Sequence, residues 1–130
     1  MDPGAEDAEP LNGGGRLESL SGALKLRVLG AALALIAAGI HFALSLVDLI
    51  PNEPTRGLGF ALMGLGYVGC AVALFGRRME YDVLVLLYAV GLVIAYAASR
   101  GELPIEGIGL TSKAAEIGLA AITVALLRRR

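Results

Sequence analysis

Residues 28–50 have the sequence VLGAALALIAAGIHFALSLVDLI, in which His41 and Asp48 are the only ionisable side chains. A helix of this length rises about 34 Å at about 1.5 Å per residue, which is enough to cross a hydrocarbon layer of about 30 Å. Pro51 and Pro54 follow immediately and end the apolar segment. The segment therefore predicts a transmembrane helix.

Three further apolar segments follow, at residues 57–76, 81–99 and 108–127, and the connections between segments are short. The whole chain is 56% hydrophobic and only 18% charged, with a mean hydropathy of +0.71. Unpaired backbone groups are costly in hydrocarbon, so each segment must be helical, and short connections make sequential helices antiparallel. We therefore expect an all-α membrane protein, an antiparallel bundle of four transmembrane helices spanning residues 28–127.

The basic residues predict the orientation of this bundle in the cell membrane. Eight of the 11 lysines and arginines fall on one side of the predicted spans: Arg16, Lys25, Arg27, Arg77, Arg78, Arg128, Arg129 and Arg130. Arg56, Arg100 and Lys113 fall on the other side. Positive charge favours the cytoplasmic side, so a multi-pass protein with both termini in the cytoplasm is predicted, with the lipid bilayer as its surroundings.

The residues before the first span divide into two parts. Residues 1–15 are acidic and rich in glycine and proline, which predicts a disordered tail. Residues 16–27 predict either a short amphipathic helix at the membrane surface or a continuation of the first span. The acidic start and the late first span are unlike a cleaved signal peptide. Residues 128–130 form a basic C-terminus.

Small residues predict where helices pack closely, because helices in lipid associate through close backbone contact. The first span carries such residues at steps of four, and so does the second. The predicted packing residues are Gly30, Ala34, Ala38, Gly66, Gly69, Cys70 and Ala73. We expect a tight contact between the first two helices, although an alanine- and glycine-rich composition alone gives a similar pattern.

Four ionisable groups inside the apolar segments form a predicted intramembrane polar cluster: His41, Asp48, Lys113 and Glu116. His41 and Glu116 each lie about 10 to 15 Å inward from the outer helix ends. We therefore expect the first and fourth helices to meet, with Glu116 near His41 and Lys113 near Asp48. Such groups either hold helices together, take part in proton or ion transport, or contact another subunit. For Asp48 and Lys113 there is a further alternative, in which each is a solvated residue near a helix end.

Three tyrosines are candidates for polar contacts. Tyr67 and Tyr88 lie deep in their segments, where each hydroxyl needs a partner, and Tyr96 lies near an outer helix end. Filling of the core by the rings is the alternative role for the deeper two.

The sequence excludes several kinds of chemistry. The single histidine and single cysteine, His41 and Cys70, are too few for a zinc or haem site, so neither a metal nor a cofactor is expected. Thr111 and Ser112 have no general base placed beside them by a known motif, and no continuous basic surface suits nucleic acid. The chain is predicted not to be an enzyme.

Three motifs resemble small four-helix membrane proteins of unknown function from haloarchaea and other prokaryotes. These are GIH at 39–41, GLGFALMGLGY at 57–67 and SKAAE at 112–116. The resemblance covers residues 33–127, and it implies the four-helix topology without implying an activity.

We therefore expect a small non-enzymatic integral membrane protein. It either forms a homo-oligomer or serves as an accessory subunit of a larger membrane complex. The alternative is a small proton- or cation-linked transporter or channel that uses His41 and Glu116.

Overall fold

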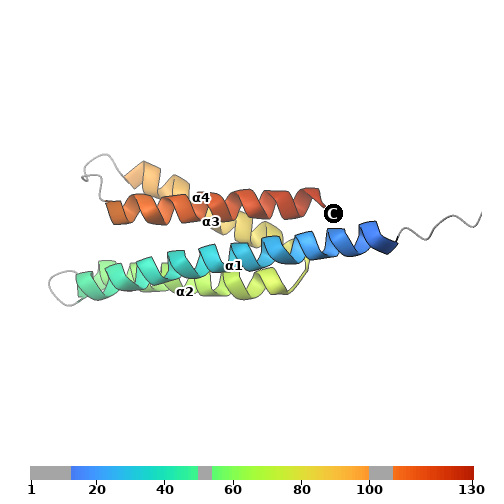
Figure 1. Ribbon diagram of the computed structural model, residues 1–130. Coiled ribbons are helices and arrows are strands. Elements are labelled where there is room, and N and C mark those ends of the chain that lie inside the picture. Colours follow the sequence, from blue (N-terminus) through green and yellow to red (C-terminus); the bar gives the residue numbers. More distant parts are fainter. Residues whose placement is uncertain (1–12, 50–53, 100–106) are drawn as a thin grey trace, which may run out of the picture.

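The computed structural model describes residues 13–49, 54–99 and 107–130, and all regular structure within them is helical (Figure 1). The elements are α1 (Gly13–Leu49), α2 (Pro54–Phe75), α3 (Met79–Ser99) and α4 (Gly107–Arg128). Each contains a stretch long and apolar enough to cross a membrane: Leu20–Val47, Pro54–Phe75, Met79–Ala98 and Gly109–Arg128. The prediction of an all-α chain with four such segments is confirmed.

Helix α1 is one continuous helix of 37 residues, and its first turns project beyond the other helices (Figure 1). It passes without a break through the predicted boundary between residues 27 and 28. Gly13 to Gly15, assigned to the tail from the sequence, form its first turn. The rest of the predicted tail, residues 1–12, lies outside the described part of the chain.

The four helices pack so that α1 contacts α2 and α4, while α3 contacts α4 and, over fewer residues, α2. The start of the α1 span lies near the end of α2, where Arg27 donates a hydrogen bond to the carbonyl of Leu74 over 2.6 Å. The end of α1 lies near the start of α2, where the Ser45 hydroxyl donates to the carbonyl of Gly57 over 2.7 Å. Because the helix pairs in contact are α1–α2, α1–α4, α3–α4 and α2–α3, helices α1 and α3 lie diagonally across the bundle.

A tight turn joins α2 to α3. The Gly76 amide donates to the carbonyl of Ala73 over 3.0 Å, and Arg77 adopts a left-handed backbone with φ of 56°. A left-handed residue after a helix is a common way to end it, because it redirects the chain. The turn brings Asp82, in the first turn of α3, to the same end of the bundle as Arg27.

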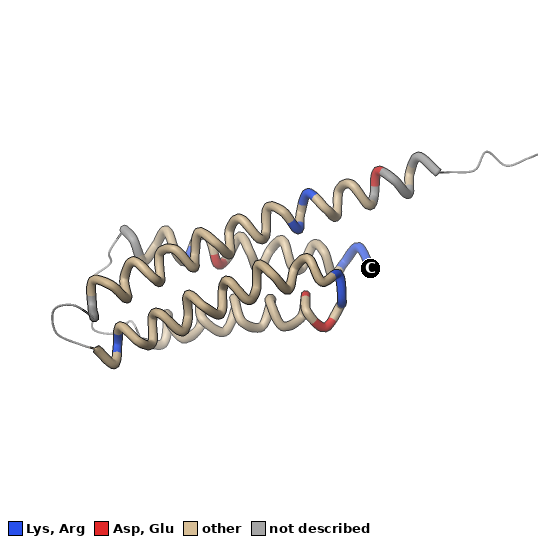
Figure 2. Tube along the Cα trace, turned by 90° about the horizontal axis from the view of Figure 1, so that it is seen from below, with Lys and Arg blue, Asp and Glu red and all other residues tan. Residues whose placement is uncertain are grey.

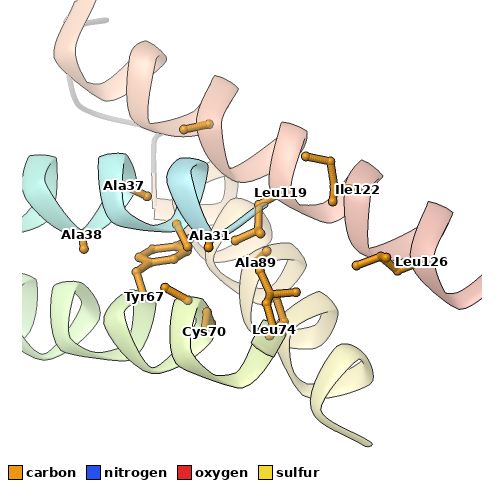
Figure 3. Packing of buried hydrophobic residues seen from close by; sticks show 14 residues of the cluster. Ala31, Ala37, Ala38, Tyr67, Cys70, Leu74, Ala89, Leu119, Ile122 and Leu126 are labelled. Atoms are coloured by element: carbon orange, nitrogen blue, oxygen red, sulfur yellow. The ribbon is translucent and has the colours of Figure 1, made fainter. Parts of the chain in front are cut away.

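The core combines small residues on α1 with large ones on its neighbours. Four alanines of α1 are buried: Ala31, Ala34, Ala37 and Ala38. Opposite them, Tyr67 and Leu74 of α2 and Leu119 of α4 are completely buried and fill the space between the helices (Figure 3). Because apolar side chains gain little by leaving lipid, this close fit is what holds such helices together.

Most of the predicted packing residues lie in this core, but two lie elsewhere. Gly30, Ala34, Ala38 and Cys70 are buried, and Ala73 packs partly against the cluster. Gly66 faces the ring of Tyr88 on α3 instead of α1, and Gly69 is exposed, with no atom within 4 Å of where a Cβ would lie. The buried face of α2 follows Gly64, Tyr67, Cys70, Ala71 and Leu74, which leaves Gly66 and Gly69 off that face.

The two off-face glycines make a matched test of the packing. We expect Gly66→Ala to lower the free energy of unfolding by about 1–3 kcal/mol, because the added methyl group would overlap the Tyr88 hydroxyl, which is held by the Met63 carbonyl. Gly69→Ala should be neutral or slightly stabilising, since that position is open and alanine favours helix. Reversible unfolding in mixed micelles measures both. Equal effects at the two positions would contradict the α2–α3 contact.

Candidate functional site

Glu116 of α4 is completely buried and lies at the centre of a polar cluster. Ser112 donates to its Oε1 over 3.1 Å, and the Lys113 ammonium contacts its Oε2 at 2.5 Å. Residues three and four positions apart share one face of a helix, so α4 alone brings these three side chains together. The charge of Glu116 is therefore compensated within its own helix.

His41 of α1 meets this carboxylate from the neighbouring helix. Its Nε2 lies 3.9 Å from Glu116 Oε1, and its Nδ1 lies 2.7 Å from the carbonyl oxygen of Ala37. A carbonyl can only accept, so Nδ1 carries the proton and donates. In the neutral imidazole, Nε2 is then the basic nitrogen, and it faces the carboxylate.

Aromatic rings from α2 and α3 enclose the pair. The His41 ring lies 5.3 Å from that of Tyr67 and 6.0 Å from that of Phe60, between centroids, and Tyr67 stacks edge-on against Tyr88 at 5.0 Å. Tyr88 donates to the carbonyl of Met63 over 2.8 Å. The Tyr67 hydroxyl is buried close to the Glu116 carboxylate, without a hydrogen-bond partner among the described residues. All four helices thus contribute to this layer.

Lys113, another predicted member of the cluster, also contacts α3. The Lys113 ammonium lies 4.8 Å from the centre of the Tyr96 ring, a cation–π contact between α4 and α3. The predicted contact between Lys113 and Asp48 involves the Asp48 side chain, which lies outside the described part of the structure. Lys113 contacts Glu116, an acid on the same face of the same helix.

A second polar cluster, which we call the arginine–aspartate cluster, lies at the opposite end of the bundle and consists of Arg27, Asp82 and Arg130. Asp82 is completely buried. Arg27 contacts both of its oxygens, at 2.9 and 3.1 Å, and Arg130 donates to Oδ2 over 2.8 Å. Arg130 also donates to the carbonyl of Arg77 over 3.1 Å. These contacts join α1, α3, the end of α4 and the turn after α2.

The sequence interpretation missed the arginine–aspartate cluster. Arg27 and Arg130 were counted only as charges that set the orientation, and Asp82 was given no role. A usable signal existed: Asp82 follows Arg77 and Arg78, and the expected antiparallel pairing would bring the starts of the first and third segments and the end of the fourth to related levels. Figure 2 shows basic residues gathered at this end, around the C-terminal end of α4.

No group of three or more His, Cys, Asp or Glu residues lies close enough to hold an ion in residues 13–49, 54–99 and 107–130. Cys70 is a free, buried thiol in the core.

The fold and the two clusters define a class: an all-helical protein with four candidate membrane-spanning segments, compatible with a small multi-pass membrane protein. No known protein family, curated protein or solved structure matches the chain. The resemblance to small haloarchaeal membrane proteins therefore stays a prediction.

Proposed function

We propose that this chain is a non-enzymatic protein of the cell membrane that crosses the bilayer four times, with antiparallel helices and both termini cytoplasmic, and that it associates with a second copy of itself. The outer face of α3 carries this proposal. Only 17% of the α3 span is buried inside the bundle, against 39% for the spans of α1 and α4.

The exposed side of α3 has a composition suited to helix packing. Its exposed residues recur at steps of four and three: Glu80, Leu84, Leu87, Gly91, Ile94 and Ala98. This heptad spacing is the one that left-handed helix pairs use, and small residues let backbones approach closely in lipid. No described atom lies within 4 Å of where a Cβ on Gly91 would be. A second copy could pack against α3 there.

The buried charges support a rigid unit that associates as a whole. Asp82 and Glu116 are each satisfied by contacts inside the chain, and these contacts connect α1, α3, α4 and the residues that follow α4. A prefolded bundle loses little conformational entropy when it associates, so a small apolar face is sufficient for self-association. An accessory role in a larger complex would use the same face with another subunit.

Gly91→Leu tests this proposal against a matched control. We expect the variant to raise the dimer dissociation constant about tenfold, because the larger side chain holds the two backbones apart. Gly39→Leu, on the exposed and equally open side of α1, should leave it unchanged. Counting photobleaching steps of labelled protein in liposomes, over a range of protein-to-lipid ratios, measures both.

Two outcomes of this experiment would contradict the proposal. Wild-type protein that stays monomeric at every ratio would remove self-association, and the accessory role would then require a co-purifying subunit from native membranes. Dimerisation that is lost in Gly39→Leu and retained in Gly91→Leu would place the contact on α1.

A second candidate function is proton-linked transport, and one observation favours it. His41 Nε2 and the Glu116 carboxylate face each other in the interior, and ionisable groups inside membrane spans commonly belong to proton or ion pathways. A proton held by either group changes the attraction between α1 and α4, which is what coupling of protonation to helix movement requires.

Flux measurements separate this candidate from a structural role. If transport operates, proton or cation flux into liposomes should fall to the protein-free background in His41→Ala. His41→Gln, which keeps the size and polarity of the side chain without a titrating group, should be equally inactive. Flux that is the same in wild type and both variants at every pH would leave His41 and Glu116 as structural contacts.

A further inference from the structure

A hollow of about 480 Å³ lies at the end of the bundle that carries the arginine–aspartate cluster. It is lined by residues from three parts of the chain: α1 contributes Leu20, Leu24 and Arg27, the turn after α2 contributes Arg77, and the end of α4 contributes Leu126, Arg129 and Arg130. Its volume is within the range of sites that bind small organic ligands.

The charge of this hollow is strongly positive. Four arginines line it, and the acid in contact with them is Asp82, which Arg27 and Arg130 share. Arg77 and Arg129 have no acidic partner among the described residues. Two exposed guanidinium groups therefore lie at one site without an acidic partner among the described residues, and such groups bind phosphate through paired hydrogen bonds.

Arg129 is placed at this hollow by the local sequence of α1. A Cβ on Gly22 would lie 2.8 Å from Arg129 Nη1, so the absence of a side chain at Gly22 lets the guanidinium lie against α1. The neighbouring apolar residues Leu20 and Leu24 are exposed, by 58% and 46% of their surfaces. Unpaired positive charge and exposed hydrocarbon thus lie side by side, at the end of the predicted membrane spans.

We propose that this hollow binds the phosphate headgroup of an anionic phospholipid, with Arg77 and Arg129 contacting the phosphate and Leu20 and Leu24 contacting the upper acyl chains. The combination of charge and apolar surface selects an amphiphile over a simple anion. Basic pockets between transmembrane helices near the membrane surface bind anionic lipid headgroups in this way. The inference is independent of self-association and rests on the proposed insertion in a bilayer.

Lipid titration of the full-length protein, followed by native mass spectrometry from detergent micelles, tests the site. Phosphatidylglycerol should bind more tightly than phosphatidylcholine. Arg77→Gln and Arg129→Gln should each weaken its binding about fivefold, and the double variant about 25-fold, as expected for about 1 kcal/mol per arginine. Arg78→Gln should change it less than about twofold, because Arg78 is exposed at the same end but does not line the hollow.

Two further measurements distinguish a lipid site from a site for soluble phosphate and from a folding defect. Leu24 is exposed, so Leu24→Asn should leave the fold and the arginines in place. It should nevertheless weaken the binding of phosphatidylglycerol, because it removes an apolar contact to the acyl chains. Inorganic phosphate at the same concentration should not displace the lipid. The proposal is overturned if phosphatidylglycerol binds no better than phosphatidylcholine, if Arg78→Gln matches Arg129→Gln, or if inorganic phosphate competes equally. Failure to insert into liposomes at all would instead contradict the membrane topology.

Discussion

Replacing Asp82 by asparagine is expected to lower the free energy of unfolding by about 3–5 kcal/mol. The carboxylate is completely buried, and it is contacted by Arg27 of α1 and by Arg130, which follows the end of α4. Asparagine keeps the shape but removes the charge, so Arg27, which is itself 7% exposed, would remain buried without a counter-ion. Breaking a buried pair from one side costs more than the pair contributes, because the uncompensated charge stays.

Unfolding in mixed micelles, monitored by circular dichroism, measures this loss. Glu80→Gln is the control, because Glu80 is an exposed acid in the same first turn of α3 and should change stability by less than about 0.5 kcal/mol. The combined variant Arg27→Met with Asp82→Leu should recover more than half of the loss, since it removes both charges. A loss for Asp82→Asn no larger than that for Glu80→Gln would show that the cluster does not hold the helices together.

Glu116→Ala is expected to have the second large effect, also a loss of about 3–5 kcal/mol. The substitution leaves a space in the interior, removes the acceptor of Ser112 and leaves the Lys113 ammonium, whose side chain is 14% exposed, without its acid. The loss should exceed that of Ile117→Ala, the adjacent residue on α4, which is exposed and faces away from the bundle.

Glu116→Gln separates charge from packing at this position. The amide fills the same volume and still accepts from Ser112, so a smaller loss than for Glu116→Ala is expected. Equal stability of wild type and Glu116→Ala would contradict the placement of this carboxylate between α1 and α4.

The parts of the structure that depend on length and local spacing could be predicted from the sequence. Segment length and apolarity indicated four helices of membrane-spanning size. His41 and Glu116 were expected to be near each other because both lie at similar distances from the outer helix ends, and they lie 3.9 Å apart between Nε2 and Oε1. Tyr88, expected to need an interior partner, donates to the Met63 carbonyl.

The parts that depend on the absolute rotation of a helix could not be predicted. Spacing shows which residues share a face, but it does not show which neighbour that face meets, so Gly66 was assigned to α1 while it lies against Tyr88 of α3. To predict the arginine–aspartate cluster, the relative positions of three helix ends would have to be known to within a few ångströms.

The accessibility of introduced cysteines shows whether the chain makes four antiparallel crossings of the membrane. In a Cys70→Ala background, single cysteines would replace Glu18, Arg56, Arg78 and Arg130, and intact cells would be labelled with a membrane-impermeant maleimide. We expect labelling of the cysteine at position 56 from outside, and labelling of those at 18, 78 and 130 only after the membrane is opened. Labelling of positions 56 and 78 from the same side would contradict this topology.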